Sequence, residues 1–127
     1  MRANTNTALR TPETWERYQN EPRRPQGTCF MCDANAITIV REYSHWLIIE
    51  NNFPYDAVAE ISHLLIPKRH FNFKETMELE EAQQLKSIEE MADAEQNYDC
   101  ILKNFSVGQS QPQHAHYHLI KWIRTNK

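Results

Sequence analysis

The sequence lacks the features that mark membrane, secreted and nucleic-acid-binding proteins. No run approaches the roughly 18 apolar residues that span a bilayer, and the N-terminus has no apolar stretch typical of a secretory signal. The net charge of −3 excludes bulk electrostatic binding of DNA or RNA, which requires a basic surface. A pocket for one phosphate needs only local donors and is compatible with this charge. We therefore expect a cytoplasmic protein without membrane or nucleic-acid partners.

Cysteine is also scarce, because the chain has three, of which two form Cys29-Phe30-Met31-Cys32. A chain of 127 residues can bury a core without disulfides, so this spacing suggests a metal site or a redox pair more than a structural disulfide. The pair is half of a zinc site, which His70 and one histidine of the segment 114–118 would complete. The alternative is two reduced, buried cysteines.

Histidine, by contrast, is concentrated: three of the six lie in the segment His114-Ala115-His116-Tyr117-His118. In an extended strand alternate side chains point to one face, so we expect the three imidazoles in a row about 6.5–7 Å apart. Ala115 and Tyr117 would then face a core. The row allows three interpretations: exposed or hydrogen-bonded strand residues, a metal site, or nucleophilic catalysis.

The order of the predicted elements favours an α+β domain over residues 27–127, with an antiparallel sheet of about five strands and one long helix packed on it. The sequence predicts strands at 36–40, 46–51, 63–67, 100–104 and 114–123, a helix at about 75–99 and a loop at 51–62. Residues 1–26 contain three prolines and five arginines. We expect them to form a partly flexible N-terminal arm, with a short helix that Thr11 caps and Pro12 begins.

Four motifs, taken together, resemble a known family. They are Cys29-Phe30-Met31-Cys32, Asn51-Asn52-Phe53-Pro54-Tyr55, Ile66-Pro67-Lys68-Arg69-His70 and His114-Ala115-His116-Tyr117-His118-Leu119-Ile120. From about Thr28 to Ile123 the chain resembles the histidine triad (HIT) family of nucleotide hydrolases and transferases, in its zinc-containing bacterial-type branch. The resemblance implies a HIT-like fold.

The resemblance also implies an activity, which is cleavage at the α-phosphate of a dinucleoside polyphosphate, a nucleoside phosphoramidate or a similar nucleotide conjugate. The middle histidine, His116, would attack the α-phosphorus and form a nucleotidyl-histidine intermediate, which water or another acceptor then resolves. His118 would assist beside the phosphate, and His63 would hold the triad in place. The intact third histidine favours a hydrolase over a transferase. The alternative is a non-catalytic, zinc-stabilised module that binds a nucleotide or another protein.

Ligand contacts and assembly follow from the same resemblance. A structural zinc ion would be held by Cys29, Cys32, His70 and His114. The nucleotide would be contacted by Asn51 at the ribose, by Ile49 and Phe30 at the base, and by Asn104, Gln109 and Ser110 at the phosphates. The segment between Ser110 and His114 is one residue longer than the usual family pattern. Homodimers are typical of the family, so we expect one here.

Overall fold

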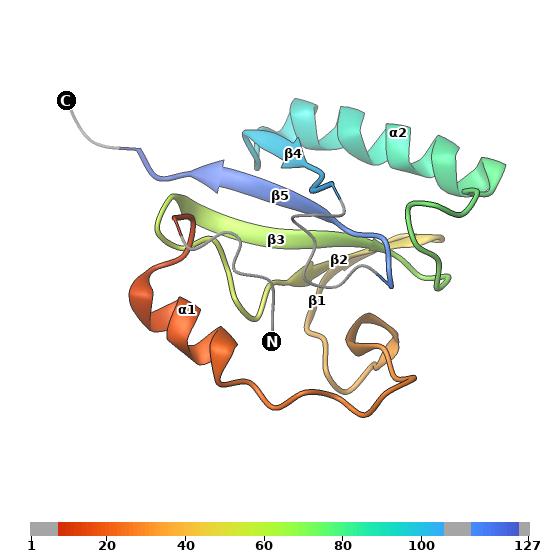
Figure 1. Ribbon diagram of the computed structural model, residues 1–127. Helices are drawn as coiled ribbons and strands as arrows, with labels where there is room; N and C mark the ends of the chain where they lie inside the picture. The colour runs from red at the N-terminus through yellow and green to blue at the C-terminus, as the bar shows by residue number, and fades with distance from the viewer. Residues whose placement is uncertain (1–7, 106–112, 125–127) are drawn as a thin grey trace.

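The computed structural model describes residues 8–105 and 113–124, whose centre is a five-stranded antiparallel sheet with the strand order β1-β2-β3-β5-β4 (Figure 1). The strands are β1 (Ile39–Glu42), β2 (Trp46–Glu50), β3 (Ala59–Pro67), β4 (Cys100–Leu102) and β5 (Tyr117–Trp122). Helix α2 (Leu79–Glu95) covers one face of the sheet, and helix α1 (Pro12–Gln19) lies beyond the opposite face. The predicted α+β fold is confirmed.

The central strand β3 separates two hydrophobic cores, because successive side chains of a strand point to opposite faces. Leu64 packs with Met31 and Ile49 on one side, which we call the α1 face. Leu65 packs with Ile88 of helix α2 on the other side, the α2 face. A residue of β3 or β5 therefore serves one face or the other according to its position in this alternation.

Strand β3 is longer than the sequence indicated. It begins at Ala59 and not at His63, so the predicted loop at 51–62 ends earlier than expected. The additional residues pair with β5 from Ala59 opposite Trp122 to Ser62 opposite Ile120, with an irregularity after Ala59. These residues include exposed and half-buried side chains, which is why no apolar run revealed the strand.

The triad does not form the predicted row on one strand. Strand β5 begins at Tyr117, opposite Leu65, so that His114 and His116 precede it. The backbone N–H of Ala115 donates instead to the carbonyl of Phe71. All three imidazoles are buried, which excludes their interpretation as exposed strand residues. The rings of His116 and His118 nevertheless remain neighbours, with centroids 5.6 Å apart.

The remaining boundaries move by a few residues. Strand β1 covers 39–42 and not 36–40, helix α2 covers 79–95 and not 75–99, and β4 ends at residue 102 and not at 104. The short helix α1 is confirmed, with Thr11 as its cap: the Thr14 N–H donates to the Thr11 hydroxyl over 3.3 Å. Neither helix in residues 8–105 and 113–124 is long and apolar enough to cross a membrane.

Candidate functional site

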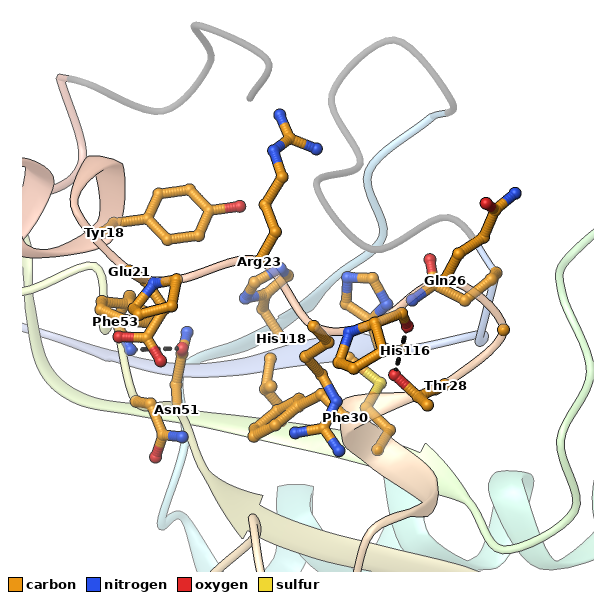
Figure 2. A pocket seen from close by; sticks show the side chains of 18 of the residues that line it. Tyr18, Glu21, Arg23, Gln26, Thr28, Phe30, Asn51, Phe53, His116 and His118 are labelled. Atoms are coloured by element: carbon orange, nitrogen blue, oxygen red, sulfur yellow. Dashed lines mark hydrogen bonds between the residues drawn. The ribbon is translucent and has the colours of Figure 1, made fainter. Parts of the chain in front are cut away.

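A pocket of about 600 Å³ opens on the α1 face of the sheet. The strand side contributes Leu64 of β3 and the triad residues His116 and His118. The segment that follows α1 forms the opposite wall, together with Phe30. Figure 2 shows the two histidines between Arg23 on one side and the Phe30 ring on the other. The pocket has the size and the mixed apolar and polar lining of a small-molecule site.

His116 is held in one tautomer. Its Nδ1 lies 3.0 Å from the backbone carbonyl oxygen of His114, so Nδ1 carries the proton and donates it to that oxygen. Burial lowers the pKa of His116 below its usual value, although the carbonyl partly offsets this effect. The ring is therefore neutral near pH 7, and Nε2 keeps a lone pair. A neutral imidazole with an unprotonated Nε2 beside a pocket is suited to nucleophilic attack.

His118 is oriented by Tyr55. The two rings stack with centroids 4.5 Å apart, and the Tyr55 hydroxyl lies 3.2 Å from His118 Nε2. The Asn104 amide donates to the Tyr55 hydroxyl over 3.2 Å, which leaves that hydroxyl to donate to Nε2. His118 Nδ1 then carries the proton, and it is buried without a hydrogen-bond partner in the described residues. Burial, followed by the neighbouring His116, lowers the pKa of His118 to about 3, so this ring is also neutral.

The four residues predicted as metal ligands come together beside the pocket. Their donor atoms lie within 4.8 Å of one another, and the four are Cys29, Cys32, His70 and His114. His114 Nδ1 is 3.5 Å from both sulfur atoms and 3.1 Å from His70 Nδ1. Tetrahedral zinc with bonds of about 2.0–2.3 Å places its ligands roughly 3.3–3.8 Å apart, so this cluster could hold a metal ion.

Two further observations fit the same cluster to a metal. His114 Nε2 lies 2.9 Å from the carbonyl oxygen of Pro67 and donates to it, which directs the Nδ1 lone pair towards the cysteines. Such a carbonyl partner is the usual support of a metal-binding histidine. Burial, together with the adjacent Cys29 thiol, raises the pKa of Cys32 to about 11. A bound cation would displace this proton, so that metal affinity would increase with pH.

His63 is not brought to the triad. It pairs with Leu119 across the β3 and β5 ladder and so points to the α2 face, where its Nδ1 lies 2.7 Å from the Tyr98 hydroxyl. His118 pairs with Leu64 and points to the α1 face. The expectation that His63 holds the triad in place is therefore wrong for direct contact, because the sheet separates the two side chains.

The predicted nucleotide contacts are divided between the pocket and the core. Phe30 and Asn51 line the pocket, and Asn51 Oδ1 accepts a hydrogen bond from the Phe53 N–H over 3.0 Å. Ile49 has no exposed surface and packs in the core beneath the pocket, so it cannot touch a base. Leu64 takes its place in the lining.

Of the three phosphate contacts that the resemblance implied, one lies in the described residues. Asn104 is not among the lining residues of the pocket. It supports His118 through Tyr55 instead. Gln109 and Ser110 lie outside the described residues.

The N-terminal arm supplies a wall of the pocket that sequence reasoning missed. Arg10, Tyr18 and every residue of the segment 21–28 line the pocket. The sequence contained one signal. The arm directly precedes Cys29, so its last residues must lie next to the metal cluster. Prolines and arginines instead suggested a flexible segment.

No family model and no curated protein matched the chain, whereas several solved structures did. An HIT family hydrolase from Clostridium thermocellum is 26% identical, with 72% of this chain and 84% of that chain covered and a TM-score of 0.52. An HIT family hydrolase from Legionella pneumophila Philadelphia 1 is 23% identical, with 78% and 96% covered and a TM-score of 0.57. A histidine triad protein from Clostridium difficile is 22% identical, with 83% and 97% covered and a TM-score of 0.56.

Proposed function

We propose that this chain, which has the fold of the histidine triad (HIT) hydrolases, is a nucleotide hydrolase in which His116 is the nucleophile. The observation that carries the proposal is the hydrogen bond from His116 Nδ1 to the His114 carbonyl. It keeps the Nε2 lone pair available in a ring that lines the pocket. Nucleophilic catalysis of this kind divides one difficult displacement into two easier ones.

The reaction proceeds in two displacements at one phosphorus atom. His116 Nε2 attacks the α-phosphorus, a phosphorus–nitrogen bond forms, and the bond to the leaving group breaks with its electrons on the leaving group. Water then attacks the same phosphorus, loses a proton to solvent, and releases a nucleoside monophosphate and the free imidazole. The Nδ1–H of His118, which has no partner among the described residues, donates to a phosphate oxygen as its charge develops, a stabilisation that is strongest in a buried site.

The Cys29, Cys32, His70 and His114 cluster binds zinc in this proposal. Four protein ligands leave no open coordination position, so the ion is structural and supplies no reacting group. Its contribution is to fix His114, whose carbonyl oxygen orients His116. The metal and the nucleophile are thus linked through one backbone segment.

Phe30 and Asn51 account for the nucleoside part of the substrate. Phe30 offers an apolar surface in the pocket for a base. The Asn51 side-chain oxygen is occupied by the Phe53 N–H, so its amide nitrogen is the atom that would contact a ribose hydroxyl. Homodimer formation and a cytoplasmic location stay predictions, and light scattering of the purified protein tests the first.

Mass spectrometry of the intact protein tests the mechanism directly. The protein is exposed briefly to adenosine phosphoramidate or diadenosine tetraphosphate and quenched under alkaline conditions, which preserve a phosphorus–nitrogen bond. We expect an adduct of one adenosine monophosphate that is absent from His116→Ala. His45→Ala, which removes a histidine of the β1–β2 turn outside the pocket, serves as the matched control and keeps the adduct.

The opposite result is equally informative. If nucleotides bind tightly but no adduct and no mononucleotide form across several bases, the chain is a non-catalytic nucleotide-binding module. An adduct that persists in His116→Ala would assign the nucleophile to another residue.

A further inference from the structure

Arg10 is a buried guanidinium at the edge of the pocket. The residue is only 6% exposed, and its charged end lies 5.1 Å from the ring of Tyr18 and 4.8 Å from the ring of Tyr55. The Nε–H donates to the carbonyl oxygen of Phe53 over 2.8 Å. One of its five N–H groups is thereby satisfied. Arg10 nevertheless lines the pocket.

The charge of Arg10 is not balanced by an acid. In the described part of the chain no ion pair joins Arg10 to a carboxylate, and Asp56, an acid that affects its pKa, accepts hydrogen bonds from Thr11 and Thr14. Burial lowers the pKa of Arg10, but a guanidinium stays charged in proteins. A buried charge without a partner costs free energy, and an anion that enters the pocket would remove that cost.

Arg23 adds a second unbalanced cation to the same wall. It lines the pocket, and no carboxylate pairs with it in residues 8–105 and 113–124. Arg24 differs, because Asp33 pairs with it at 2.8 Å. Three arginines and one acid, Glu21, line the pocket altogether, while both lining histidines are neutral. The pocket therefore carries a surplus of positive charge.

Arg10 is linked to the triad through Tyr55. Arg10 stacks on Tyr55, which itself stacks on His118, and the charge of Arg10 is one of the causes that lower the pKa of His118, after burial and His116. Figure 2 shows Arg23 extending away from the Phe30 ring. A nucleotide with its base at Phe30 and its α-phosphate at His116 would thus present its leaving group to the arm.

We propose that Arg10 is an anion-binding, specificity-determining residue, assisted by Arg23, and that the arm selects nucleotides with a second anionic group, phosphate or carboxylate, attached beyond the α-phosphate. The proposal rests on the proposed function for the orientation of the nucleotide. A planar guanidinium binds either group through two parallel hydrogen bonds, which a lysine cannot reproduce. Substrates whose leaving group is neutral would lose this contact.

Binding measurements separate this proposal from the proposed function, because they require no turnover. AMP, ADP and the glycine phosphoramidate of AMP are titrated calorimetrically into His116→Ala protein, which consumes none of them. ADP adds a phosphate to AMP, and the phosphoramidate adds a carboxylate. We expect at least one of the two to bind about tenfold more tightly than AMP, the gain of one charge-assisted contact.

Added to the His116→Ala protein, Arg10→Gln is expected to abolish this preference and to change the affinity for AMP by less than about twofold. Arg10→Lys, which keeps the charge, should retain only part of the preference. Arg17→Gln is the matched control: Arg17 also lies on the arm, stacks on an aromatic ring and donates to a backbone carbonyl, but does not line the pocket. It should leave the preference unchanged.

Partial unfolding of a variant lowers the affinity for all ligands together, so the ratio between ligands still reports Arg10. Which of the two ligands is preferred identifies the anion as phosphate or carboxylate. Equal binding of all three ligands by His116→Ala protein that retains Arg10 overturns the proposal. So does a preference that survives in Arg10→Gln. If Arg10→Gln loses the preference but no adduct forms in the mass spectrometry experiment, the anion site is retained and the catalytic mechanism is refuted.

Discussion

The two sides of the pocket are built by different physical means. On the strand side, His116 and His118 are neutral, buried and oriented by a backbone carbonyl and by Tyr55. On the arm side, Arg10 and Arg23 are charged and have no acidic partner in the described residues. A reacting group must be held in one tautomer and one direction, whereas a group that selects a ligand needs charge that the ligand can neutralise. The strand side is therefore suited to the reaction, and the arm side is suited to the choice of ligand.

The two sides also differ in how they are attached. The strand side belongs to the sheet and to the Cys29, Cys32, His70 and His114 cluster. The arm is joined to the loop before β3, where Asp56 accepts from the Thr11 N–H at 2.9 Å and from the Thr14 hydroxyl at 2.5 Å. Ala57 N–H also donates to the Leu9 carbonyl over 3.0 Å. A few side-chain and backbone hydrogen bonds thus join the arm to this loop.

The largest expected effect is on the strand side. Replacing His116 with alanine removes the proposed nucleophile, and we expect the rate of mononucleotide release to fall by about 10⁴-fold or more. The affinity for ADP should change little, because Arg10 and Phe30 are untouched. Steady-state kinetics and calorimetry measure the two quantities. A fall of less than tenfold in the rate would contradict the assignment.

Removal of the metal should have the next largest effect, and it should act on stability before chemistry. Cys29→Ser is expected to abolish the proposed zinc binding and to lower the melting temperature by about 10 °C or more, since the free energy of metal binding is part of the folding free energy. Elemental analysis and thermal unfolding measure both. Cys100→Ser, which changes the cysteine outside the cluster, is the control and should keep the metal.

Weakening the attachment of the arm should reduce the proposed preference for ADP over AMP without stopping the proposed hydrolysis. Burial raises the pKa of Asp56, but hydrogen bonds from Thr14 and Thr11 outweigh it and leave the pKa lowered. A carboxyl whose pKa is lower in the folded state stabilises that state above its unfolded pKa of about 3.9, and the contribution disappears as the pH falls through the folded value.

Asp56→Asn should therefore cost about 1–2 kcal/mol of arm docking and reduce the preference for ADP over AMP. It should also remove the acid dependence of docking below about pH 4, which the fluorescence of Trp15 on α1 reports. Asp93→Asn, an exposed change on helix α2, is the control. A preference unaltered by Asp56→Asn would show that the arm is held by other contacts.

The smallest effect is expected from the other face of the sheet. His63→Ala removes a hydrogen bond to Tyr98 and should destabilise the fold by about 1 kcal/mol. The value of kcat/KM should change by less than about twofold, because His63 does not face the pocket. A loss of 100-fold would show that His63 acts on the triad through the sheet, as the family resemblance first implied.

Local pattern was sufficient for most of the fold. Alternation and β-branched runs indicated five strands, and the long helix followed from its periodicity. The cysteine pair, His70 and His114 were grouped correctly although they lie far apart in the chain, because the motif order matched a family whose ligands occupy those positions. Errors arose where pairing with a neighbouring strand, and not an apolar run, decides that a segment is a strand. The polar start of β3 is an example.

Site residues were predicted less evenly than the fold. Phe30, Asn51, His116 and His118 line the pocket as expected. Ile49 and His63 do not, for different reasons: His63 faces the other side of the sheet, whereas Ile49 shares the face of the pocket but is completely covered by its neighbours. A sequence contains the alternation of a strand but not the identity of what covers each face.

The sequence by itself determined which groups are available for chemistry: two cysteines and two histidines that could hold a metal, a histidine that we propose to be the nucleophile, and the strands around them. Tertiary structure alone decided the tautomer of His116, the face occupied by His63 and the position of Arg10. Arg10 donates to Phe53, which is 43 positions away, and no local propensity encodes such a contact. Motifs indicate candidate reacting groups because only a few residue types can perform a given chemical step. Long-range packing then decides which of these groups lie close together.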